Sequence, residues 1–164
     1  MRKQKGFSLI ELLIVVAIIL IIAAIAIPNL LRARIAANES SAVASVRTVN
    51  TAEVAYNSAY PTVGFATTLT NLTGTCSGTT TPTSTSACLI DATLAGGTKS
   101  GYSFALDNGG STSTPQGAYS MDGGPISPNQ TGVRYFCSAA DGVVRYGASS
   151  FSGATCQSTG TPLQ

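Results

Sequence analysis

Two hydrophobic patterns follow one another in the first sixty residues. From Leu12 to Leu31, twenty consecutive residues carry no charge. As a helix rising ~1.5 Å per residue they would span about 30 Å, the hydrocarbon thickness of a bilayer. Further on, apolar residues recur at steps of three, four and seven, which predicts an amphipathic helix. Its apolar stripe comprises Ile35, Ala42, Val46, Val49, Ala52 and Tyr56. The polar residues that we expect mostly outside the stripe are Arg34, Glu39, Arg47 and Asn50.

Together these stretches predict one long helix from about Phe7 to about Ala59. Glycine is absent throughout this range. The pair Tyr60-Pro61 should end the helix, because a residue before proline avoids the helical conformation. Pro28 lies inside the pattern, where it removes one backbone hydrogen bond. We expect it to kink the helix without ending it.

The rest of the chain predicts an irregular connector and then a small antiparallel sheet. Residues 61–100 are rich in Thr, Ser and Gly and show no periodicity. Four short runs with strand character follow, at residues 101–106, 117–121, 132–137 and 143–147. Turns are expected at residues 107–110 and 122–125, and Asp141-Gly142 is a hairpin signal. A sheet of this size needs a cover, so we expect one face to pack on the apolar stripe. The predicted fold class is α+β.

Four cysteines lie beyond the apolar run: Cys76, Cys88, Cys137 and Cys156. An even number after an export-type N-terminus favours two disulfides in an oxidising compartment. Three pairings exist, and we favour Cys76–Cys88 and Cys137–Cys156 because each closes a local loop. The alternatives are buried free thiols, or a zinc site, which the long spacings and the absence of histidine disfavour.

Charge and composition disfavour several function classes. The formal net charge is +2, but without the first six residues six basic residues face seven acidic ones, a balance of −1. The chain has no basic stripe, which disfavours nucleic-acid binding through phosphate contacts. It also lacks histidine, a G-x-S-x-G or P-loop motif and a cluster of metal ligands. We therefore expect no enzyme, no catalytic residue and no cofactor.

Two ordinary interpretations of the N-terminus fit poorly. A secretory signal cut at Ala24-Ile25-Ala26 would leave a protein starting near Ile27, but the apolar core is longer than the usual ~7–15 residues. The helical pattern also continues through that site. A simple membrane anchor explains the length and the basic flank, which places the N-terminus in the cytoplasm. It does not explain Glu11, nor the junction Gly6-Phe7 at the boundary of the apolar run.

The segment KGFSLIELLIVVAIILIIAAIAIPNLLRAR, residues 5–34, closely resembles the N-terminus of type IV pilins and of the related pseudopilins of type II secretion systems. The matching features are a short basic leader ending in Gly6, then Phe7, Glu11, an aliphatic stretch and Pro28. In that family a membrane-embedded aspartic peptidase cuts after the glycine and methylates the new N-terminus. The resemblance implies cleavage between Gly6 and Phe7 and N-methylation of Phe7. It also implies a pilin-like fold, a long kinked helix whose second half packs on a small sheet.

Glu11 has a physical role in this interpretation. After cleavage Phe7 carries a free ammonium, and Glu11 lies one helical turn further on the same face. An ammonium from the same chain or from a neighbour would neutralise the carboxylate in apolar surroundings. The alternative is a carboxylate that snorkels to the membrane edge. Pro28 is either a passive kink or a point where the helix loosens on assembly.

The resemblance divides the chain into four parts. Residues 1–6 are the leader, and residues 7–31 are the transmembrane and filament-core helix. Residues 32–60 form the amphipathic helix, and residues 61–164 form the head. The head comprises the disulfide-clipped loop 61–100 and the sheet and C-terminal loop 101–164. Because some secretion pseudopilins bind calcium in this part of the fold, calcium is the one cofactor alternative. The acidic turn residues are Asp107, Asp122 and Asp141.

We expect a structural subunit of a type IV pilus. It would be inserted in the inner membrane with its head in the periplasm, and processed by prepilin peptidase. An inner-membrane assembly platform would then assemble it into a homo-oligomeric filament. The family alternative is the major pseudopilin of a type II secretion system, which forms a periplasmic filament. The alternative from another class is an anchored or secreted binding module that does not polymerise.

Overall fold

The structure is a computed structural model that describes residues 7–74, 81–153 and 155–163. Helix α1 runs over Leu9–Ala59 and continues through Pro28, as predicted, although it begins two residues later than expected. The chain divides into two units, one ending at Arg34 and the other beginning with Ile35. The first unit contains the apolar half of α1, and the second contains the amphipathic half and the head.

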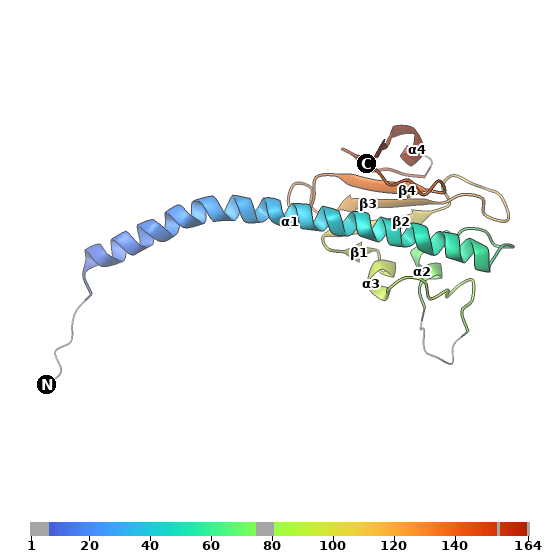
Figure 1. Cartoon of the computed structure of the whole chain (residues 1–164), viewed down its shortest axis with the longest axis horizontal. Coiled ribbons are helices and arrows are strands. Elements are labelled where there is room, and N and C mark those ends of the chain that lie inside the picture. The colour runs from blue at the N-terminus through green and yellow to red at the C-terminus, as the bar shows by residue number, and fades with distance from the viewer. Residues whose placement is uncertain (1–6, 75–80, 154, 164) are drawn as a thin grey trace. The chain divides into compact units, whose positions relative to one another are not determined.

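Within the described residues, six strands form one antiparallel sheet in the order β1-β2-β3-β4-β5-β6 (Figure 1). Their bounds are β1 Thr98–Lys99, β2 Tyr102–Asp107, β3 Ser120–Pro125, β4 Tyr135–Ala139, β5 Arg145–Gly147 and β6 Thr161–Pro162. The four central strands confirm the prediction, and the two-residue edge strands β1 and β6 were not predicted. The hairpin signal is also confirmed, since Asp141-Gly142 joins β4 to β5 and Gly142 donates to the Ala139 carbonyl at 2.8 Å. This is the predicted α+β class.

The turn predicted at residues 122–125 is wrong, because these residues belong to β3. The two glycines there make room for aromatic rings of neighbouring strands. A Cβ on Gly123 would lie 3.0 Å from the Phe104 ring, and one on Gly124 would lie 2.9 Å from the Tyr135 ring. Glycine inside a strand often marks such a close approach. The Asp-Gly-Gly-Pro pattern at residues 122–125 was thus wrongly interpreted as a turn.

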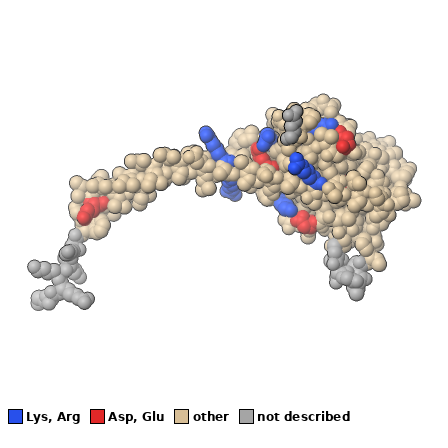
Figure 2. All heavy atoms as spheres, in the orientation of Figure 1, with Lys and Arg blue, Asp and Glu red and all other residues tan. Residues whose placement is uncertain are grey.

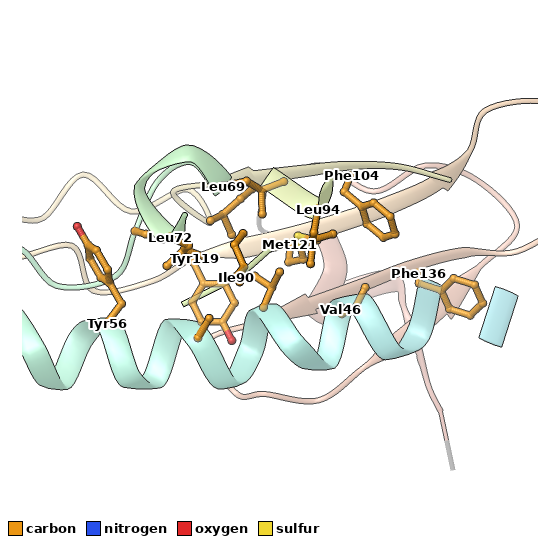
Figure 3. Packing of buried hydrophobic residues seen from close by; sticks show 14 of the residues in the cluster. Val46, Tyr56, Leu69, Leu72, Ile90, Leu94, Phe104, Tyr119, Met121 and Phe136 are labelled. Atoms are coloured by element: carbon orange, nitrogen blue, oxygen red, sulfur yellow. The ribbon is translucent and has the colours of Figure 1, made fainter. Parts of the chain in front are cut away.

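The apolar stripe of α1 packs on the sheet, as expected (Figure 3). Ala42, Val46, Val49, Ala52 and Tyr56 are buried, while Ile35 is only half-buried. The sheet contributes apolar side chains from β2, β3 and β4 to the same cluster, among them Phe104, Met121 and Phe136. One hydrophobic core therefore joins the second half of α1 to the head.

The described part of the head also contains three short helices: α2 Leu69–Leu72, α3 Ala92–Ala95 and α4 Thr155–Thr159. The first two lie within the segment predicted to be irregular. They bury Leu69, Leu72 and Leu94 in the core. Each has only four residues, too few for a helical period to be recognised in the sequence.

The predicted disulfide between Cys137 and Cys156 is confirmed. It joins β4 to α4 across 19 residues, and both cysteines are fully buried. The other predicted pairing includes Cys76, which lies outside the described residues, so Cys76–Cys88 stays a prediction.

Replacing Cys137 and Cys156 together by alanine should lower the free energy of unfolding by about 2 kcal/mol, the low end of the usual range. The low end applies because the β5–β6 pairing also holds the C-terminal segment. Urea unfolding in detergent, followed by tyrosine fluorescence, measures the change. Gln157→Ala, an exposed change in the same helix, should stay within about 0.5 kcal/mol of wild type. Equal midpoints for the double variant and Gln157→Ala would contradict a stabilising role.

Candidate functional site

The start of α1 has the geometry of a helix cap. Ser8 precedes the helix, and its carbonyl accepts the Leu12 N–H at 3.3 Å. Its own backbone N–H donates to Glu11 Oε2 at 2.9 Å. A glutamate in the first turn that accepts the amide of the capping residue is half of a capping box. The sequence signal was Ser8-Leu9-Ile10-Glu11, an S-x-x-E pattern that was not among the predictions.

This cap places the Glu11 carboxylate beside the predicted new N-terminus. Phe7 directly precedes Ser8, and the residue is 78% exposed. The Ser8 amide nitrogen that contacts Glu11 is one residue from the nitrogen that cleavage would turn into an ammonium. The positive end of the helix dipole also favours a carboxylate in the first turn. Gly6 lies outside the described residues, so the cleavage site stays a prediction.

The first half of α1 is apolar on every side. Most of its large aliphatic side chains are exposed, and an 18-residue window is apolar enough to cross a membrane, with 0% of it buried. In Figure 2 this stretch carries one acidic group near its start and no other charge before the first basic residues. A helix that is apolar all round requires lipid or other apolar helices around it.

Pro28 interrupts the hydrogen bonding inside this apolar stretch. Proline has no N–H, so the Ala24 carbonyl loses the donor that it would have in a regular helix. Along a helix, Pro28 lies about 25 Å from Glu11, so the two predicted assembly residues occupy separate places. The role of Pro28 in assembly stays a prediction.

Glu39 contacts the head, although it was expected outside the stripe. Its Oε1 accepts the backbone N–H groups of Val133 and Arg134 at 3.0 and 3.1 Å. Its Oε2 lies 2.7 Å from Arg134 Nη2 and 2.8 Å from Nε. Burial raises the pKa of Glu39, but these hydrogen bonds and the Arg134 charge outweigh it and hold the pKa below its usual value. The prediction for this side chain was wrong, because four donors compensate its burial.

Asn50 also faces the head, contrary to the prediction. Its Nδ2 donates to Ser138 Oγ at 2.8 Å and to the Gly142 carbonyl at 3.1 Å. Its Oδ1 accepts the Tyr119 hydroxyl at 3.2 Å. The amide thus links α1 to the hairpin and the core, and these partners compensate its loss of water.

A second glutamate of α1, Glu53, is fully buried, with 0% of its surface exposed. Its Oε2 accepts the Ala66 N–H at 2.9 Å, and its Oε1 has no hydrogen-bond partner among the described residues. Burial raises the pKa of Glu53 to about 7, although the Ala66 hydrogen bond opposes the rise. This is the least compensated polar side chain in the described core. Its spacing, four residues after Val49 and three before Tyr56, places it in the apolar stripe, but its burial was not among the predictions.

The three aspartates considered for calcium lie in different surroundings. Asp107 accepts the N–H groups of Gly109 and Gly153. Asp122 is half-buried on β3, and burial together with the Asp107 charge raises its pKa to about 6. Asp141 forms an ion pair with Arg145 at 2.6 Å. Within residues 7–74, 81–153 and 155–163 no three His, Cys, Asp or Glu side chains form a metal-binding group.

Comparison with known proteins identifies the start of the chain. Residues 1–27 match the model of the prokaryotic N-terminal methylation motif. The chain carries this motif. The matched residues include Gly6, Phe7 and Glu11, three of the residues on which the resemblance to type IV pilins and pseudopilins rests. That resemblance is confirmed.

Curated relatives match over somewhat longer stretches. The chain is 68% identical over 40 residues to the type IV wide pilus major component PilA4 of Thermus thermophilus, covering 24% of this chain and 30% of that protein. It is 45% identical over 54 residues to the type IV major pilin protein PilA of Myxococcus xanthus, covering 33% and 24%. It is 42% identical over 65 residues to the type II secretion system core protein G of Vibrio cholerae, covering 38% and 44%. The matches thus span less than half the length of each relative. No solved structure matches the chain.

Proposed function

We propose that this chain is the structural subunit of a type IV pilus filament, with no catalytic activity of its own. The observation that carries the proposal is the first half of α1, which is apolar on all sides, almost entirely exposed and part of a match to a methylation motif. The only acidic side chain in this half lies in the first helical turn. Such a surface suits lipid first and sister helices afterwards.

The proposed sequence of events begins in the inner membrane, with the head in the periplasm. Prepilin peptidase removes residues 1–6 and methylates Phe7. An inner-membrane assembly platform then moves the subunit from the bilayer into a homo-oligomeric filament, which extends outside the cell. In the filament core the Glu11 carboxylate and a Phe7 ammonium neutralise each other. No nucleic acid, cofactor or metal takes part.

A second candidate is the major pseudopilin of a type II secretion system. The similarity to core protein G of Vibrio cholerae supports it, because that match covers 65 residues and 38% of this chain. Such a subunit would be processed in the same way and would form a periplasmic filament. Filaments sheared from the cell surface support the pilus, and filaments confined to the periplasm support the pseudopilus.

The mature N-terminus tests the processing step that both candidates share. We expect mass spectrometry of the protein from membranes or filaments to find Phe7 as the first residue, with one added methyl group. A variant with Gly6→Leu should keep its leader, because a large side chain would block the small-residue cleavage site. A chain starting at Met1 would indicate a simple anchor, and one starting near Ile27 a secretory signal. Either would contradict the proposed function.

A further inference from the structure

The head has a cavity of about 220 Å³ on the face of the sheet that points away from its core. Successive side chains of a strand point to opposite faces. Met121 of β3 is fully buried in the core, so the next side chain, Asp122, points to the other face and lines the cavity. Ser103 and Ala105 of β2 also line it, and both are exposed between buried neighbours. The cavity thus lies within the head alone.

Two aromatic side chains line this cavity, and each packs against a glycine. A Cβ on Gly124 would lie 2.9 Å from the Tyr135 ring, and one on Gly147 would lie 2.7 Å from the Phe151 ring. The absence of these Cβ atoms lets both rings approach the backbone of the sheet closely. Tyr135 and Phe151 are only half-buried, so part of each residue stays accessible to a ligand in the cavity.

Asp122 supplies the cavity with a carboxylate that has little compensation. Its Oδ1 accepts the Ser120 hydroxyl at 3.3 Å, and no other side-chain or backbone donor of the described residues bonds to its carboxylate. No basic side chain is among the described residues that line the cavity. Burial and the charge of Asp107 raise the pKa of Asp122 to about 6, because the ionised form lacks a partner. A cation in the cavity would supply that partner.

A carboxylate beside aromatic rings recognises an organic cation. Ring faces attract a cation within about 6 Å of their centre, and a carboxylate forms charge-assisted hydrogen bonds with an ammonium or guanidinium group. The volume limits the size of the ligand, because pockets for drug-sized molecules measure about 300–1,000 Å³. A calcium ion fits less well, since it takes roughly 6–8 oxygen ligands and Asp122 is the one carboxylate among the described lining residues.

We propose that this cavity binds an organic cation, an alkylammonium or guanidinium group the size of a lysine or arginine side chain. Asp122 pairs with its charge, and Tyr135 and Phe151 contact the cation and its carbon chain. A small molecule and a basic side chain of another protein present the same group. The site lies in the head and requires neither membrane insertion nor polymerisation, so it goes beyond the proposed function and is tested separately from it.

Two ligands of the same shape test the site on the full-length chain in non-ionic detergent. N-butylguanidinium carries the charge, and N-butylurea is its neutral isostere. Saturation-transfer NMR measures the binding of each. We expect a Kd of roughly 1 mM for the cation, in keeping with its small size. The urea should bind at least about tenfold more weakly, because it lacks the charge-assisted bond to the carboxylate. Equal affinities would overturn the proposal.

Variants of the cavity locate the binding. Asp122→Asn removes the charge but keeps an acceptor for the Ser120 hydroxyl, and it should weaken the binding of N-butylguanidinium about tenfold or more. Phe151→Leu should weaken it about threefold. The matched control is Asp91→Asn, which removes a negative charge outside the cavity and keeps a capping residue for α3. Its affinity should equal that of wild type. Wild-type affinity of Asp122→Asn, or the same loss in Asp91→Asn, would contradict the site.

A short peptide distinguishes the two sources of the cation. The same measurement is made with acetyl-Gly-Arg-Gly-amide, and with its citrulline counterpart as the neutral control. If the arginine peptide binds at least as tightly as N-butylguanidinium, the site accepts a basic side chain of another protein. If N-butylguanidinium binds and the peptide does not, the site takes a small molecule. Both results support the cation site, and binding of neither charged ligand would refute it.

Discussion

Replacing Glu11 by glutamine should abolish filament assembly and leave the chain in the membrane. In the proposed filament a carboxylate and an ammonium share apolar surroundings. Removing one partner of such a buried pair costs on the order of 3–5 kcal/mol, because the other charge remains uncompensated. Because every subunit would lose this free energy at its contact with a neighbour, the loss is large enough to stop polymerisation. In the precursor membrane, by contrast, a neutral side chain is at least as well accommodated as a charged one.

The structure explains why glutamine is the right substitution. Glu11 has a local role, since its Oε2 accepts the Ser8 N–H at 2.9 Å. The amide oxygen of glutamine can accept the same bond, so Glu11→Gln removes the charge and keeps the helix cap. Glu11→Leu removes both. Equal defects in the two variants indicate that the charge decides assembly, because loss of the cap then adds nothing.

Three measurements on the same cells define the result. Membrane fractions report insertion, mass spectrometry of the N-terminus reports cleavage and methylation, and sheared or periplasmic filaments report assembly. We expect wild-type insertion and processing of Glu11→Gln and a loss of filaments. Wild-type filament yield would refute the pairing, and so would filament loss that only accompanies failed insertion.

The parts of the fold that follow from periodicity were predicted from the sequence. The stripe of α1 is an example: Val46, Val49 and Tyr56 are all buried against the sheet. The hydrophobic effect acts on each of these residues separately, so their spacing alone identifies the buried face. The same holds for the four central strands and for the apolar helix, whose length matches a bilayer.

The residues whose positions were predicted wrongly have partners that are distant in the sequence. Glu39 is buried because backbone N–H groups 94 and 95 residues away compensate it. Gly123 lies in a strand because a phenylalanine of the neighbouring strand occupies the space of its side chain. Neither partner can be inferred without the register of the sheet. The cap at Ser8 was different, since its S-x-x-E signal is local and was present in the sequence.

Glu53 has the largest energetic consequence for the head. Its spacing was a signal that was not used, since it lies four residues after Val49 and three before Tyr56, both in the core. Its Oε2 is satisfied by the Ala66 N–H, and its Oε1 has no partner among the described residues. A charge there has too little compensation, which is why burial raises the pKa of the carboxyl to about 7.

We therefore expect the free energy of unfolding to fall as the pH rises from 4.5 to about 7. The unfolded chain loses the Glu53 proton near the ordinary pKa of 4.5, whereas the folded head keeps it until about 7. Between these values folding binds a proton, so each increase in pH favours the unfolded state. The difference of about two and a half pKa units corresponds to about 3 kcal/mol, fully lost above pH 7.

Glu53→Gln should remove this pH dependence. Glutamine can still accept the Ala66 N–H but cannot ionise, so the variant should be more stable than wild type at pH 8, by up to about 3 kcal/mol. Near pH 4 the two proteins should be similar. All six tyrosines lie from Tyr56 onward, so urea unfolding followed by tyrosine fluorescence reports on the head alone. The full-length chain in non-ionic detergent serves for the measurement.

Asp122→Asn is the matched control, because burial also raises the pKa of Asp122, to about 6, on the opposite face of the sheet. That variant should remove only the contribution of Asp122 between pH 3.8 and about 6 and keep the loss of stability that Glu53 causes between pH 4.5 and about 7. The lowered pKa values of Glu39 and Asp141 act with the opposite sign, but they are common to all the proteins compared and cancel in the differences. Parallel stability curves for wild type and Glu53→Gln from pH 4 to 8 would mean that Glu53 is ionised in the folded head at neutral pH. Groups beyond the Ala66 amide would then compensate its charge, and burial would not control its ionisation.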